Sequence, residues 1–105
     1  MAKSEIIWTE ESCEWLRRIR EYIAKDRPEA ADRVVEGIWQ KAQMLSANPE
    51  AGFKYPLPLC GRNDIRVLVY GHYRIAYLVG ERTVSILGVF HAALDIDRYF
   101  PNIPK

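Results

Sequence analysis

Three residues in the second half of the chain carry the side chains that metal-free RNA cleavage requires. Such cleavage needs a base for the 2′-hydroxyl, a cation for the phosphorane and an acid for the leaving oxygen. Arg74, His91 and Tyr99 can supply these groups, since a guanidinium binds phosphate bidentately and an imidazole titrates near neutral pH. Structural alternatives are common, because a strand arginine usually snorkels to solvent or pairs with a carboxylate, and a strand-end histidine is usually hydrogen-bonded. Both interpretations stay open at these positions.

Other catalytic chemistries have no matching pattern in the chain. It contains no glycine-rich phosphate loop, nucleophile elbow or metal-ligand cluster. His72 is interpreted as a turn residue, and neither histidine has cysteine or carboxylate neighbours at metal spacing. Cys13 and Cys60 match no zinc pattern and are interpreted as free thiols in a reducing compartment. The sequence therefore predicts no metal and no cofactor.

The charge of the chain is nearly balanced. A formal net charge of +1 does not indicate a polyanionic partner. Basic residues that would suit a nucleic-acid groove are interspersed with acidic ones, and they are Lys54, Arg62, Arg66 and Arg82 among Glu50, Asp64 and Glu81. This mixture favours a solvated surface over a basic groove.

The size and composition are those of an ordinary globular protein. The 105 residues, 49% hydrophobic and 28% charged, predict one domain over residues 1–105. The first five residues lack the apolar core of a signal peptide. The longest apolar stretch, Val84–Leu94, is too short to span a bilayer. We therefore expect a cytoplasmic protein with no membrane partner.

A short strand and two helices occupy the first half of the chain. Ile6–Trp8 is β-branched and aromatic, which favours a strand. Thr9 can cap a helix that should end near Asp26, because Pro28 disfavours α geometry in the residue before it. Pro28 suits the first turn of a second helix, which Asn48 and the following proline end. The connection is very short, so the two helices are expected to pack antiparallel.

Three strands are predicted after a long loop, Glu50–Asn63. Gly71 and His72 suit a tight turn between the first two strands, with glycine at the first central position. The predicted strands are Ile65–Tyr70, Tyr73–Val79 and Val84–His91, and Asp95–Phe100 suits one helical turn. The fold class is therefore α+β: a short N-terminal strand, an antiparallel helical hairpin, and a three-stranded antiparallel meander packed against the helices.

Counting along these strands gives a register for the sheet. If Tyr70 faces Tyr73 and Val79 faces Val84, Arg74 lies opposite both Val69 and Val89. His91 is two residues beyond Val89, which predicts that it shares a face with Arg74. The opposite face would carry Tyr73, Ile75, Tyr77, Ile86 and Phe90.

Three aromatic residues border the apolar stripes of the helices: Trp15, Tyr22 and Trp39. Aromatics in such positions are usually part of the core. The chain has three Trp, six Tyr and three Phe, which is many for a domain of this length. Any that stay uncovered would mark a protein interface.

The order of these features resembles the RelE/ParE toxin superfamily, and it is closer to ParE-like members. The resemblance runs roughly from Ile6 to His91 and depends on the ordered set rather than on one motif. Its residues are Ile7-Trp8-Thr9, Leu16, Ile19, Tyr22-Ile23-Ala24, Pro28-Glu29-Ala30-Ala31, Asn48-Pro49, Gly52, Arg66, Tyr73-Arg74-Ile75, Tyr77 and Ile86-Leu87-Gly88-Val89-Phe90-His91.

The resemblance implies a type II toxin that is bound and silenced by a cognate antitoxin in a hetero-oligomer. RelE-like members are ribosome-dependent endoribonucleases that cut messenger RNA. ParE-like members share the fold, act on DNA gyrase and lack the ribonuclease residues. Antitoxin-binding residues are expected at Trp15, Trp39, Arg66 and Arg74.

Residue by residue, the ribonuclease pattern is only partly matched. Arg74 falls on the arginine that RelE-like enzymes use at the scissile phosphate, but ParE-like members commonly carry it as well. Tyr99 falls roughly at the catalytic tyrosine, while Ala92–Leu94 stands where a basic cluster is expected. RelE-like enzymes carry a pair of lysines in the loop, and only one of them is matched here, by Lys54. His91 resembles the strand-end histidine of many ParE-like sequences.

We therefore favour a ParE-like poison that acts on DNA gyrase through protein contacts. A ribosome-bound nuclease gains affinity from many phosphate contacts and needs a strongly basic surface, which a net charge of +1 does not indicate. The first alternative is a RelE-like, metal-independent endoribonuclease that acts on ribosomes and messenger RNA. The second is a degenerate, non-toxic member that only binds antitoxin.

Overall fold

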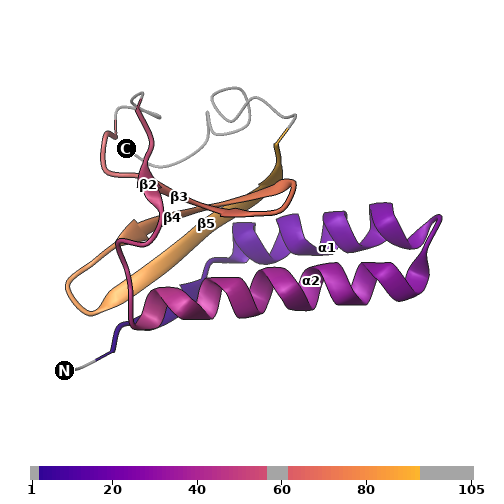
Figure 1. Cartoon of the computed structure of the whole chain (residues 1–105), viewed down its shortest axis with the longest axis horizontal. Coiled ribbons are helices and arrows are strands. Elements are labelled where there is room, and N and C mark those ends of the chain that lie inside the picture. Colours follow the sequence, from indigo (N-terminus) through magenta and orange to yellow (C-terminus); the bar gives the residue numbers. More distant parts are fainter. Residues whose placement is uncertain (1–2, 57–61, 93–105) are drawn as a thin grey trace.

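Two helices pack against one face of a five-stranded sheet in the computed structural model, which describes residues 3–56 and 62–92 (Figure 1). The helices run antiparallel, as the short connection between them predicted. The elements are β1 (Glu5–Trp8), α1 (Glu10–Ala24), α2 (Pro28–Gln43), a 3₁₀ turn η1 (Met44–Ser46), β2 (Phe53–Lys54), β3 (Arg66–Tyr70), β4 (Tyr73–Val79) and β5 (Thr83–His91). The predicted α+β class, helical hairpin and meander are confirmed. The predicted helical turn Asp95–Phe100 lies outside the described residues.

The strand order is β1-β5-β4-β3-β2, and every neighbouring pair is antiparallel except β1 with β5. The sequence predicted β1 but not its place at the sheet edge. It also missed β2, because two residues within a long loop show no periodicity. Gly52 allows this loop to approach the sheet, since a Cβ there would lie 2.7 Å from the hydroxyl oxygen of Tyr77.

The first helix is fastened to the sheet at its N-terminus. The hydroxyl of Thr9 accepts a hydrogen bond from the Ser12 N–H at 3.1 Å and donates one to the Ile86 carbonyl at 2.7 Å. The N-cap predicted from the sequence thus also joins α1 to β5. Proline opens α2 at its first residue, as predicted. In the described part of the chain, no helix is long and apolar enough to cross a membrane.

The register of β3 with β4 is as predicted. Tyr70 faces Tyr73 and Val69 faces Arg74, across a turn in which Gly71 adopts a φ of 56°. Only glycine adopts such a conformation readily, which explains its place at the first central position.

A register shift between β4 and β5 overturns part of the predicted sheet. Val79 faces Val84 as expected, but the register shifts between Ala76 and Tyr77, so one residue of β5, Leu87, has no direct partner. Beyond this bulge Arg74 faces Phe90, not Val89, and Tyr73 faces His91. The prediction that Arg74 and His91 share a face is therefore wrong, and so is the placement of Phe90 on the face of Ile75.

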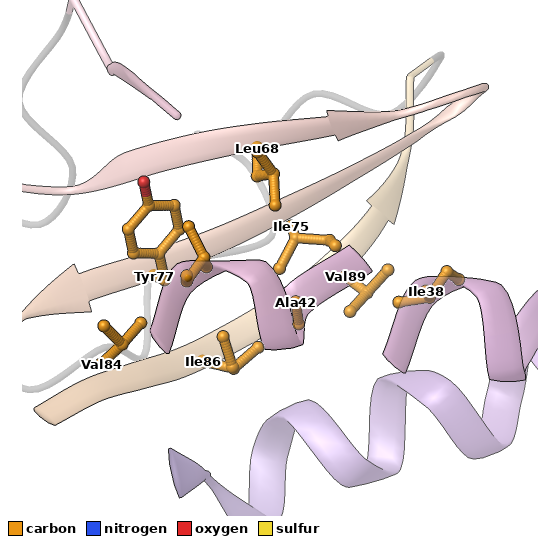
Figure 2. Close-up of a cluster of buried hydrophobic side chains, with 9 residues drawn as sticks. Ile38, Ala42, Leu68, Ile75, Tyr77, Val84, Ile86 and Val89 are labelled. Atoms are coloured by element: carbon orange, nitrogen blue, oxygen red, sulfur yellow. The ribbon is translucent and has the colours of Figure 1, made fainter. Parts of the chain in front are cut away.

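The main core fills the space between the helices and the sheet. Side chains from α2 meet those of β3, β4 and β5 there, and Figure 2 shows Ile38 and Ala42 of α2 among the strand residues. Each large apolar side chain that is fully buried contributes roughly 1.5–3 kcal/mol of transfer free energy. The cluster consists of Ile38, Ala42, Leu45, Leu68, Ile75, Tyr77, Val84, Ile86 and Val89. A smaller cluster is formed by Ile65, Ala76 and Phe90.

Candidate functional site

A groove lies between α1 and the sheet, where β4 begins and β5 ends. Its volume is about 480 Å³, and we call it the aromatic groove. One wall comes from successive turns of α1, because side chains three and four residues apart share one face of a helix. The lining residues are Trp15, Arg18, Ile19, Tyr22, Tyr73 and His91.

Ring contacts shape the floor and the rim of this groove. The Trp15 ring lies 4.7 Å from the Phe90 ring, centroid to centroid, and the Arg18 guanidinium lies 5.7 Å from the Trp15 centroid. At the other side, the Tyr73 ring meets His91 edge-on at 5.5 Å. Tyr22 is an open member of the groove, with 75% of the residue exposed. Contacts of this geometry hold the aromatic surfaces in fixed positions.

His91, which lines the aromatic groove, lies beside a second histidine. The rings of His72 and His91 stack with centroids 6.0 Å apart and an interplanar angle of 17°. Burial raises the pKa of Tyr73 above its ordinary value, so its hydroxyl is protonated and can donate a hydrogen bond at neutral pH. Together with the Arg18 guanidinium, these side chains make the rim polar, whereas the walls are apolar.

The arrangement is suited to binding an apolar side chain of another protein. An open, rigid aromatic surface with a polar rim is typical of the centre of a protein interface. Among residues 3–56 and 62–92, no group of three or more His, Cys, Asp or Glu is placed to hold a metal ion. Cys13 is a free, exposed thiol, and Cys60 lies outside the described residues.

Of the three residues proposed for RNA cleavage, the two that the structure describes lie on opposite faces of the sheet. Arg74 lies on the face of the sheet that is turned away from His91, beside its cross-strand neighbours Val69 and Phe90. Its guanidinium donates hydrogen bonds to the carbonyls of Gly71 and Tyr73, each at 3.1 Å. The bulge in β5 causes this separation. Tyr99 lies outside the described residues.

The residues predicted to bind antitoxin are dispersed over the surface. Trp15 lines the aromatic groove. Trp39 is 48% exposed on α2 and is not among the groove residues. Arg66 lines a separate cleft at the end of β4, which also contains Lys54 and Asp64. Arg74 lies near the start of β4, on the face of the sheet opposite to Arg66. Only Trp15 belongs to the aromatic groove.

Two groove residues were not singled out from the sequence. Arg18 carried no functional prediction, although its spacing of three from Trp15 and four from Tyr22 places all three on one helix face. Tyr73 was assigned to the face opposite Arg74, which the structure confirms. What the sequence could not indicate is that His91 joins this face, since that depends on the bulge.

Comparison with known proteins gives matches over most of the chain. A family model described as "ParE toxin of type II toxin-antitoxin system, parDE" matches residues 6–96. The chain is 36% identical over 92 residues to Y4kP, a candidate toxin of Sinorhizobium fredii, and the match covers 88% of this chain and 92% of the relative.

Solved structures with the same fold come from toxin–antitoxin systems. A chain of the chromosomal ParDE system from P. aeruginosa superposes with a TM-score of 0.73 at 21% identity, covering 85% of this chain and 96% of that one. A chain of the RelBE2 toxin–antitoxin complex from Mycobacterium tuberculosis has a TM-score of 0.66 at 21% identity, covering 87% and 93%. A mutant of E. coli toxin RelE in the free state has a TM-score of 0.65 at 18% identity, covering 96% and 95%.

Proposed function

Because the chain belongs to the ParE toxin family of type II toxin–antitoxin systems, we propose that a cognate antitoxin silences it by binding in the aromatic groove. The observation that carries this proposal is the open aromatic surface along α1, where Tyr22 is 75% exposed beside Trp15. Exposed apolar surface of this kind is costly in water and gains free energy when a partner covers it. The neighbouring toxin–antitoxin structures support a protein as that partner.

Substitution of Tyr22 tests the groove cleanly, because this side chain is exposed and contributes little to the fold. With the protein encoded by the neighbouring open reading frame as antitoxin, Tyr22→Ala should weaken binding by about tenfold or more, as expected for an aromatic anchor at an interface. Phe53→Ala is the matched control, since Phe53 is a half-exposed aromatic on β2, outside the groove. Equal dissociation constants for Tyr22→Ala and wild type, measured by calorimetry, would refute the groove as the binding site.

Trp15 and Trp39 extend the same test. Trp15→Ala should weaken antitoxin binding as Tyr22→Ala does, although it also removes a contact with Phe90 and so needs a parallel stability measurement. Trp39→Ala reports whether the antitoxin continues along α2, where this side chain is 48% exposed. We expect a loss of affinity for both, and unchanged binding for both would rule out an antitoxin segment along the helical hairpin.

For the cellular target, we propose DNA gyrase rather than messenger RNA. The separation of Arg74 from His91 supports this choice, because acid, base and phosphate-binding groups must act on the same few atoms. Two further observations support gyrase, since phosphate contacts need cations. The cross-strand neighbours of Arg74 are apolar, namely Val69 and Phe90, and the net charge of the chain is only +1.

Two assays run side by side distinguish the candidate functions. The toxin should inhibit supercoiling by purified gyrase and leave messenger RNA intact on translating ribosomes. Cleavage on ribosomes that Arg74→Ala abolishes, with gyrase unaffected, would overturn the gyrase proposal in favour of the ribonuclease. If antitoxin binds but neither target is affected, the chain is a non-toxic member that only binds antitoxin.

A further inference from the structure

A second hollow, the charged cleft, lies at the opposite end of β4 from the aromatic groove. Its volume is about 280 Å³, and its lining combines acidic and basic side chains around one valine. The lining residues are Glu50, Lys54, Asp64, Arg66 and Val79. Tyr73 and Val79 are the two ends of β4, so the two sites are roughly 20 Å apart along the strand at 3.3 Å per residue.

Two cations meet in this cleft across a pair of strands. Lys54 of β2 and Arg66 of β3 are direct cross-strand partners, so their side chains leave the same face with Cβ atoms about 5 Å apart. Like charges in this position repel each other, and an anion between them would relieve the repulsion.

The acidic residues of the cleft leave much of that charge uncompensated. Arg62 engages Asp64 through two hydrogen bonds of 3.0 and 2.6 Å. Glu50 approaches Arg66 only to 3.8 Å, which is beyond hydrogen-bond range, and its side chain is 77% exposed. Lys54 and Arg66 are thus opposed by the loosely held carboxylate of Glu50 and by Asp64, which acts on Lys54 through charge while its oxygens accept from Arg62.

The side chain of Arg66 is largely covered, and its donors remain available. Its side chain is 22% exposed, and within residues 3–56 and 62–92 its guanidinium donates no hydrogen bond. Arg66 faces Tyr77 across the sheet, and the Tyr77 hydroxyl joins the Pro49 carbonyl to the Gly52 N–H. These bonds fix the segment that carries Glu50 and Lys54, which preorganises the cleft for a ligand.

We propose that Lys54 and Arg66 bind one carboxylate, the side chain of an aspartate or glutamate of the antitoxin. The inference rests on the proposed function, and it adds the chemistry by which a second part of the partner is recognised. The planar fork of an arginine matches a carboxylate with two parallel hydrogen bonds. The acids Glu50 and Asp64 at the cleft repel a run of phosphates, which favours a single carboxylate of a protein over a nucleic-acid backbone.

The test measures antitoxin affinity by calorimetry on full-length toxin. Lys54→Gln and Arg66→Gln should each weaken binding at least about fivefold, and the loss should shrink as salt is raised. Glu50→Gln should tighten binding, because it removes the carboxylate that competes for Arg66. Arg82→Gln, an exposed arginine in the loop before β5, is the control and should match wild type.

Three outcomes overturn the proposal. The first is affinity within twofold of wild type for both Lys54→Gln and Arg66→Gln. The second is weaker binding of Glu50→Gln, which would mean that the Arg66–Glu50 pair only supports the fold. The third is binding of a 20-nucleotide RNA that Lys54→Gln abolishes, which would assign the cleft to phosphate.

The two proposals fail in different ways. Wild-type toxin that binds no antitoxin overturns the proposed function, and this inference falls with it. If Tyr22→Ala weakens binding while the Lys54 and Arg66 variants do not, the aromatic groove stands and only the carboxylate site is refuted. Independent effects are expected, because sites this far apart usually contribute additively.

Discussion

Replacing Tyr77 with phenylalanine removes a single oxygen atom that joins the end of the helical hairpin to the sheet. The hydroxyl donates a hydrogen bond to the Pro49 carbonyl at 2.8 Å and accepts one from the Gly52 N–H at 2.9 Å. Tyr77 is fully buried, and Gly52 is buried as well. The ring of phenylalanine fills the same space, so the substitution tests the two hydrogen bonds and little else.

The expected cost follows from what each partner loses. An orphaned N–H at buried Gly52 costs about 1–3 kcal/mol. The carbonyl of half-buried Pro49 can reach water, so it adds less than about 1 kcal/mol. A net loss near 2 kcal/mol corresponds to a fall in Tm of about 9 °C, because unfolding entropy scales at roughly 2.1 cal/mol/K per residue. This is a large fraction of the stability of a typical domain.

Thermal and denaturant unfolding of both proteins provides the measurement. The control is Tyr22→Phe, which removes a hydroxyl from a 75% exposed side chain and should change stability by less than about 0.5 kcal/mol. The reasoning fails if Tyr77→Phe is as stable as this control. Weaker antitoxin binding is also expected from Tyr77→Phe, because the segment that positions Lys54 is loosened.

The same hydroxyl makes a prediction about alkaline pH. Burial raises the pKa of Tyr77, against a smaller opposing effect of the Gly52 hydrogen bond. A group whose pKa is raised by folding stabilises the protein fully below its unfolded pKa of about 10, and this contribution is lost as pH rises through the folded value. Tyr77→Phe should therefore lose less stability than wild type above pH 10. The pKa of Tyr73 is also raised by burial and contributes equally in both proteins.

Three further substitutions test separate contacts. Gly37→Ala should destabilise the protein by about 1–2 kcal/mol in urea unfolding, because the new Cβ would overlap the Tyr70 hydroxyl. In a Tyr70→Ala background, where that hydroxyl is absent, Gly37→Ala should instead be stabilising. Thr9→Ala should cost about 1–2 kcal/mol in the same assay, since it removes the N-cap of α1 and a bond to β5. The hydrogen bond from Arg62 lowers the pKa of Asp64. Arg62→Gln should therefore raise the pKa of Asp64 in a carboxyl NMR titration. Any stability from the Arg62–Asp64 pair is present above the unfolded pKa of Asp64 and is lost as pH falls through the folded pKa.

Most elements of the fold could be predicted from the sequence, because local residue patterns determine them. Thr9 and Pro28 begin helices for reasons of capping and ring geometry, and Gly71 allows the turn that sets Tyr70 opposite Tyr73. By contrast, the segment just before β2 is joined to the sheet by the Tyr77 hydroxyl, which lies 25 residues from Gly52 along the chain. No local pattern reports a contact of that range.

The candidate sites divide in the same way. Trp15 and Tyr22 were identified as bordering residues from helical spacing alone, and both line the aromatic groove. Arg66 was predicted to meet a partner, but its pairing with Lys54 became visible only with β2 in place. The proposed link between Arg74 and His91 was an inference from counting, and counting cannot detect an extra residue in one strand.

The sequence by itself determined the family, the helical hairpin and the meander, since these follow from the order of local patterns along the chain. The tertiary structure decided which faces the functional side chains share. The side-chain period of a strand is two, so the one-residue bulge at Leu87 moves His91 away from Arg74 and into the aromatic groove with Tyr73. That displacement separates the residues a ribonuclease would need and completes a surface suited to binding a protein.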